Sequence, residues 1–87
     1  FIIEDDLHTE VIGKQFCTFD SALNELRRIA DIPFGEAPNK PPCTSWQDCL
    51  REYHIVNYDD SQNPWALLSD TKILEISKTE VRWFYNK

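Results

Sequence analysis

A helical repeat of apolar residues runs from residue 18 to residue 31, in the stretch TFDSALNELRRIAD. The apolar residues recur at intervals of three and four, which places them on one face of a helix. They are Phe19, Ala22, Leu23, Leu26, Ile29 and Ala30. Thr18 is suited to cap the N-terminus, and Pro33 ends the element because the residue before a proline avoids helical dihedral angles. The pattern predicts an amphipathic helix over residues 18–31.

An alternating pattern with a period of two residues predicts strands elsewhere. In residues 52–58, Tyr53 and Ile55 fall on one face, whereas His54 and Val56 fall on the other. Short apolar runs within residues 1–16 predict one or two further strands.

The C-terminal stretch KILEISKTEVRWFYNK predicts a β-hairpin whose tip is Lys78-Thr79. Pairing Ser77 with Glu80 brings favourable partners opposite each other: Leu74 with Trp83, Ile76 with Val81, and Glu75 with Arg82. A shift of one residue would separate all of these pairs, so the pattern predicts the register as well as the hairpin.

These elements predict a single small globular domain of the α+β class over residues 1–87. We expect one antiparallel sheet of four to five strands, with the main helix 18–31 packed on one face and a C-terminal β-hairpin. Residues 33–45 hold four of the five prolines and predict a loop that closes one end. Asn63-Pro64 predicts a brief helical turn through residues 65–68.

The charge of the chain narrows the classes of function. Fifteen acidic and nine basic residues give a net charge of −6. A phosphate-binding surface needs clustered lysine and arginine, so the sequence disfavours nucleic acid and anionic membranes as partners. No apolar run approaches the roughly 20 residues of a membrane span. An acidic surface instead favours association with a basic protein.

The leading hypothesis is a small acidic protein-binding module, cytoplasmic, without cofactor or enzymatic activity. An inhibitor- or immunity-type protein that neutralises a basic enzyme fits this size and charge. Exposed aromatic residues beside carboxylates suit a protein interface, which we place at Trp65, Tyr58, Phe84, Asp59 and Asp60. Such a module is expected to be a monomer. The first alternative is a homodimeric structural domain that associates through the hairpin edge or the Phe84 face.

A second alternative is a metal- or redox-linked domain. Cys17, Cys43, Cys49 and His54 would supply three sulphurs and one nitrogen, a ligand set that tetrahedral zinc accepts. Five residues separate Cys43 from Cys49, however, which is more than the roughly two to four of common zinc knuckles. A Cys43–Cys49 disulfide and a reactive Cys43 thiolate are further alternatives. The odd number of cysteines favours the reducing cytoplasm, where disulfides are rare.

The simplest interpretation of the two cysteines is structural. Ser45 and Asp48 have capping-box spacing and predict a short helical turn. That turn would place Trp46, Cys49 and Leu50 on one face, with Cys49 buried in the core as free cysteine commonly is.

His8 lies among four carboxylates in the sequence, Glu4, Asp5, Asp6 and Glu10. Such a setting raises the pKa of an imidazole and also suits metal binding through mixed nitrogen and oxygen ligands. A solvated turn is the simpler interpretation.

Overall fold

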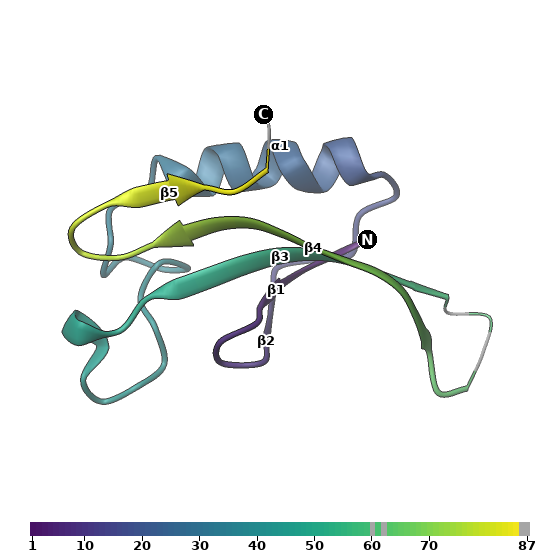
Figure 1. The fold of residues 1–87 in the computed structure, drawn as a ribbon, viewed down its shortest axis with the longest axis horizontal. Helices are drawn as coiled ribbons and strands as arrows, with labels where there is room; N and C mark the ends of the chain where they lie inside the picture. Colours follow the sequence, from purple (N-terminus) through teal and green to yellow (C-terminus); the bar gives the residue numbers. More distant parts are fainter. Residues whose placement is uncertain (60, 62, 86–87) are drawn as a thin grey trace.

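The computed structural model describes residues 1–59, 61 and 63–85. These residues form a five-stranded sheet and one α-helix in two layers (Figure 1). The elements in chain order are β1 (Ile2–Asp5), β2 (Glu10–Ile12), α1 (Phe19–Ala30), the 3-10 turn η1 (Trp46–Asp48), β3 (Arg51–Asp59), β4 (Ala66–Ile76) and β5 (Val81–Trp83). All neighbouring strands are antiparallel, in the order β2-β1-β3-β4-β5. The predicted α+β class is confirmed.

Helix α1 forms where the apolar repeat predicts it. Thr18 is the N-cap, and its side-chain oxygen accepts a hydrogen bond of 3.1 Å from the backbone amide of Ser21. At the other end the backbone amide of Asp31 closes the last turn on the carbonyl of Arg28. Within the described ranges, no helix has the length and apolarity that crossing a membrane requires.

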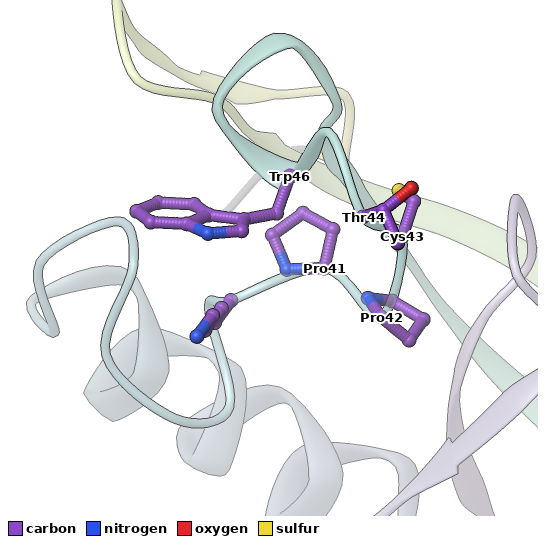
Figure 2. A pocket seen from close by; sticks show the side chains of 6 residues that line it. Pro41, Pro42, Cys43, Thr44 and Trp46 are labelled. Carbon is purple, nitrogen blue, oxygen red and sulfur yellow. The ribbon is translucent and has the colours of Figure 1, made fainter.

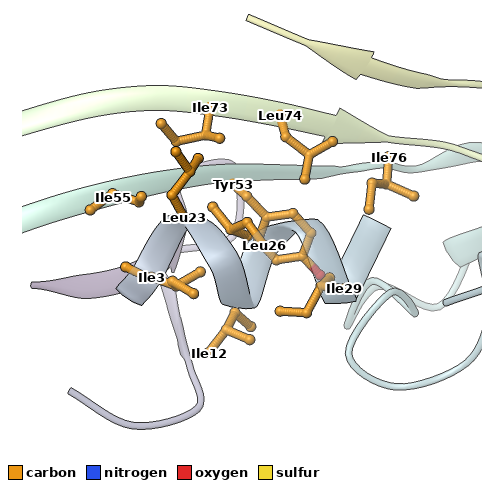
Figure 3. Packing of buried hydrophobic residues seen from close by; sticks show 11 residues of the cluster. Ile3, Ile12, Leu23, Leu26, Ile29, Tyr53, Ile55, Ile73, Leu74 and Ile76 are labelled. Carbon is orange, nitrogen blue, oxygen red and sulfur yellow. The ribbon is translucent and has the colours of Figure 1, made fainter. Parts of the chain in front are cut away.

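The hydrophobic core lies between α1 and one face of the sheet (Figure 3). Its buried members are Ile3, Ile12, Ala22, Leu23, Leu26, Ile29, Tyr53, Ile55, Ile73, Leu74 and Ile76. Tyr53 and Ile55 belong to this cluster, whereas His54 and Val56, also buried, do not. The alternation of side chains along β3 therefore follows the prediction.

The predicted register of the C-terminal hairpin is confirmed. Its three pairs are Leu74 with Trp83, Glu75 with Arg82, and Ile76 with Val81. The backbone amide of Ser77 donates to the carbonyl of Glu80 at 3.0 Å, which closes the turn at the predicted tip.

Strand β4 begins six residues earlier than that hairpin suggested. Residues 66–69 pair with the end of β3, through Asp59 with Ala66 and Tyr58 with Leu67, so the helical turn predicted there is wrong. The register shifts between Asn57 and Tyr58 and again between Tyr53 and His54. Each bulge adds a residue to one strand and bends it. Cross-strand pairing thus overrides the local turn signal.

The loop predicted over residues 33–45 is fixed to both layers by one buried side chain. Asn39 donates to the carbonyls of Ile29 and Ile32 at 2.8 and 2.7 Å, just at the C-terminal end of α1. Its side-chain oxygen accepts a hydrogen bond of 2.7 Å from the hydroxyl of Tyr53. The loop therefore has a defined position between the helix and β3.

We predict that Leu26→Ala destabilises the fold by about 2–5 kcal/mol, because Leu26 is fully buried and the change leaves a cavity. Urea denaturation followed by circular dichroism measures the free energy of unfolding. Leu68→Ala makes the same chemical change at a residue that is 61% exposed and should have little effect. Equal losses in the two variants would contradict the assignment of the core.

Candidate metal centre

Three side chains from distant parts of the sequence meet at one end of the sheet. His8 lies in the turn between β1 and β2, Cys43 in the loop before η1, and Cys49 directly after η1. The Nε2 atom of His8 is 3.1 Å from Sγ of Cys49 and 3.3 Å from Sγ of Cys43. The three donor atoms lie within 4.8 Å of one another, and all three residues are half-buried.

Asp5, at the end of β1, fixes the orientation of the His8 ring. Its carboxylate is fully buried and accepts a hydrogen bond of 2.6 Å from Nδ1 of His8. Because Nδ1 is held by Asp5, Nε2 is the ring nitrogen that faces the two sulphurs. The turn itself is tight, because Thr9 adopts a φ of +52°, a left-handed conformation that β-branched residues rarely take.

Arg51 holds the other side of the Asp5 carboxylate. The residue is 4% exposed, and its guanidinium donates to Asp5 Oδ2 at 2.8 Å and pairs with Glu10 at 2.7 Å. It also donates to the backbone carbonyls of Pro38 and Lys40 at 2.9 and 3.1 Å. One side chain therefore joins β1, β2, β3 and the loop that carries Cys43.

Cys43 lies next to a segment of the loop that packs around Trp46 (Figure 2). In this view the Pro41 ring lies between the Trp46 indole and Cys43. Gly35 packs against the indole with a φ of +95°, and a Cβ there would lie 2.9 Å from the ring, so only glycine fits. Cys43 also borders a surface hollow lined by Lys40, Pro41, Pro42, Thr44 and Trp46, which gives the thiol an approach from solvent.

The electrostatics of the cluster favour a thiolate at Cys49. A hydrogen bond from the Cys43 thiol and another from His8 lower the pKa of Cys49, whereas donating that bond raises the pKa of Cys43. Desolvation pulls the pKa of His8 down, but the hydrogen bonds to Asp5 and Cys49 outweigh it and raise the pKa. The two sulphurs of the pair therefore differ, with the pKa of Cys49 lowered and that of Cys43 raised.

The separation between the imidazole nitrogen and each sulphur is close to that of zinc ligands. Zinc binds thiolate at about 2.3 Å and imidazole at about 2.0–2.1 Å, so a tetrahedral angle separates sulphur from nitrogen by about 3.5 Å. The observed separations, 3.1 and 3.3 Å, are shorter by only a few tenths of an ångström. They equally fit S–H to nitrogen hydrogen bonds, whose protons a metal ion would displace.

Of the four metal ligands predicted from the sequence, the structure brings together Cys43 and Cys49. Cys17 is exposed and lies outside the cluster, and His54 points to the other face of the sheet because it alternates with the buried Tyr53. His8 takes the position expected of His54. Its acidic neighbours signalled a metal ligand, but nothing local indicated that residues 43 and 49 would approach it.

The predicted burial of Cys49 in the core is wrong. Residues 46–48 form only a 3-10 turn, without a side-chain cap from Ser45 and without a buried residue. Cys49 follows this turn in extended conformation and faces His8 instead of the core.

His54 forms a separate cluster with carboxylates on the face of the sheet away from α1. Its Nδ1 lies 2.6 Å from Asp70, and its Nε2 lies 2.8 Å from Glu52 and 3.9 Å from Asp6. Burial lowers the pKa of His54, but the hydrogen bonds to Asp70 and Glu52 have the larger combined effect and raise it. Its carboxylate partners offer a metal ion oxygen ligands only, without the thiolate sulphur that selects zinc.

The residues predicted as an interface occupy different parts of the β3–β4 hairpin and the C-terminus. Trp65 is exposed and packs on the half-buried Tyr58, with ring centroids 6.0 Å apart. Phe84 is exposed after β5, beneath the ammonium group of Lys72 at 4.2 Å. Asp59 ends β3 and accepts hydrogen bonds from Ser61. Asp60 lies outside the described residues.

Comparison of the chain with protein-family models, with curated proteins and with solved structures finds no match. Any function has to be inferred from the side chains themselves.

We predict that Asp5→Asn lowers the free energy of unfolding by about 3–5 kcal/mol, because it removes the buried carboxylate and leaves Arg51 with only the more exposed Glu10 as a charged partner. Chemical denaturation in the presence of a chelator measures this loss without a contribution from metal. Glu25→Gln removes an ion pair from the surface of α1 and should change stability little. Near-equal effects of the two variants would refute the importance of the buried pair.

We predict that the His54 cluster stabilises the fold at acidic pH. The folded-state pKa of His54 is raised, so its contribution is fully present below the unfolded value of about 6.5 and is lost as pH rises through the folded value. Unfolding free energies of the wild type and His54→Gln should converge with rising pH across that window. The opposite trend would show that the carboxylates fail to hold the proton. The charged groups around the ring are Glu4, Asp6, Glu52, Asp70 and Lys72.

Proposed function

We propose that this protein is a zinc-binding domain whose ligands are His8, Cys43 and Cys49. The observation that supports the proposal is the convergence of one imidazole nitrogen on two sulphurs at 3.1 and 3.3 Å. The residues come from three separate segments, so the convergence is a property of the fold. The sequence alone indicated a metal site at these residues only weakly.

The donor set favours zinc over other divalent ions. Thiolate sulphur is a soft ligand that selects zinc or copper(I), whereas magnesium and calcium prefer oxygen. An imidazole with two thiolates is a common partial ligand set for zinc. The lowered pKa of Cys49 helps to supply the first thiolate, and metal binding would displace the proton from Cys43.

The surroundings of His8 support the same assignment. A histidine that binds zinc usually donates its other nitrogen to a carboxylate or carbonyl, which fixes the ring and raises its basicity. Asp5 accepts from Nδ1 at 2.6 Å and is itself held by Arg51. Such outer partners typically contribute about 10–100-fold to metal affinity.

Three protein ligands leave one position of a tetrahedral zinc for water or another molecule. Within the described part of the chain, no further histidine, cysteine or carboxylate joins the cluster. Sites with one exchangeable position are the arrangement that zinc enzymes use, but closed structural sites take all four ligands from protein. The proposal covers binding of the ion and assigns no reaction to it.

Titration of the chelator-treated, reduced protein with Zn²⁺ or Co²⁺ tests the proposal. We expect one ion per chain, and visible Co²⁺ bands of the tetrahedral type with sulphur-to-metal charge transfer. Because metal binds the folded state, zinc at 100 times its dissociation constant should add about 2.7 kcal/mol to stability. Native mass spectrometry before and after EDTA gives the stoichiometry directly.

Three variants and one matched control locate the site. His8→Gln, Cys43→Ser and Cys49→Ser should each weaken zinc binding more than the roughly 10–100-fold typical of outer partners. Cys17→Ser, at the exposed cysteine, should bind like the wild type. In the wild-type protein, zinc should protect Cys43 and Cys49 from alkylation but leave Cys17 reactive. This last measurement remains decisive if a variant fails to fold.

Two results would contradict the proposal. Zinc affinity that Cys17→Ser lowers as much as Cys43→Ser would place the metal elsewhere. Freshly purified protein with a Cys43–Cys49 disulfide, and without zinc affinity after reduction, would favour the redox alternative at the same two sulphurs.

A further inference from the structure

The outer edge of β4 is open along its first half. Strand β4 pairs with β3 along nearly its whole length, from Ala66 to Ile76. On its other side, β5 pairs only with residues 74–76, and the amides of Phe84 and Tyr85 reach no further than the carbonyl of Ile73. No strand formed by the described residues covers residues 66–72 on that side. Figure 1 shows this end of the β3–β4 hairpin extending past β1 and β5.

The first six residues of the open edge carry neither lysine nor proline. Proteins commonly block exposed edges with lysine, proline, bulges or very short strands. Residues 66–71 read ALLSDT, and the protection present is Lys72 at the end of the open segment and the bulge at Leu68. Leu67 and Leu68 are 59% and 61% exposed, and Trp65 beside them is 47% exposed. The bulge at Asn57/Tyr58 leaves Leu68 without a partner on β3, which helps to explain why two consecutive leucines face solvent.

The charge of the β3–β4 hairpin indicates which kind of chain can pair with the open edge of β4. Residues 52–72 contain four acidic residues and one basic residue, Lys72. A second copy of the chain would bring the same acidic hairpin and another net charge of −6 against it. A basic segment would instead meet opposite charge on approach.

We propose that the edge of β4 over residues 66–72 binds an extended segment of a basic protein by strand addition. Backbone hydrogen bonds to β4 provide the pairing, and the exposed leucines and Trp65 take up apolar side chains of the segment. The net negative charge of the hairpin attracts its lysine or arginine residues. This surface lies at the end of the sheet away from Cys43 and Cys49, so the proposal does not depend on zinc.

Selection from a random dodecapeptide library on the immobilised wild-type protein tests the proposal. We expect selected peptides to be enriched in lysine and arginine and to alternate apolar with polar residues. The amides of residues 66–72 should become protected from hydrogen exchange when such a synthetic peptide binds. Higher salt should weaken binding, because the attraction is in part electrostatic.

A matched pair of variants localises the binding. Leu68→Lys places a charge on the open edge and should lower the affinity for the selected peptide at least about tenfold. An edge lysine opposes strand pairing and repels a basic segment. Val11→Lys introduces the same charge on β2, at the opposite edge of the sheet, at a residue that is also exposed. It should bind within about twofold of the wild type, since exposed rim charges contribute little.

Four outcomes would overturn the proposal. They are a selection that returns no binder, selected peptides without excess positive charge, protection confined to other strands, and equal losses in the two lysine variants. Concentration-dependent dimerisation abolished by Leu68→Lys would show that a second copy occupies the edge instead, and would also overturn it.

Discussion

The arrangement of this protein depends on one buried ion pair, between Asp5 and Arg51. Removing two charges from water costs several kcal/mol per ion in effect, so the pair is tolerable only because each group is fully hydrogen-bonded. Asp5 accepts from Arg51, from His8 and from two backbone amides, of Leu7 and Glu52. Among the described residues, no buried side-chain nitrogen or oxygen lacks a partner. Such a network requires that each of its members stay in place.

The same network fixes the geometry of the candidate metal centre. Asp5 sets the tautomer and the direction of His8, and Arg51 holds the loop that delivers Cys43 through the carbonyls of Pro38 and Lys40. Stability and metal affinity are therefore coupled at Asp5. A change there would disturb both, whereas a change at Cys43 or Cys49 removes a ligand and leaves the ion pair intact. That difference is why the ligand variants, and not Asp5, distinguish a metal site from a structural cluster.

Features with a local period could be predicted from the sequence, and features set by distant contacts could not. The repeat of α1 and the pairing of Leu74 with Trp83 follow from residues close in the sequence, and both are confirmed. The extension of β4 arises from pairing with β3, which overrides the turn signal of Asn63-Pro64. The approach of His8 to Cys43 and Cys49 spans 35 and 41 residues and has no local signature.

The proposed zinc site and the proposed peptide-binding edge lie at opposite ends of β3, which explains why each can be tested alone. The strand runs from Arg51, at the cysteine end, to Asp59, at the hairpin end, a span of about 26 Å at roughly 3.3 Å per residue. A Zn²⁺ ion that binds the Cys49 thiolate and displaces the proton of Cys43 raises the net charge of the chain by one unit. The chain stays acidic, so zinc would weaken the long-range attraction of a basic partner only slightly. Any larger effect of zinc on peptide affinity would have to be transmitted through β3 itself, whose two register shifts lie between the ends.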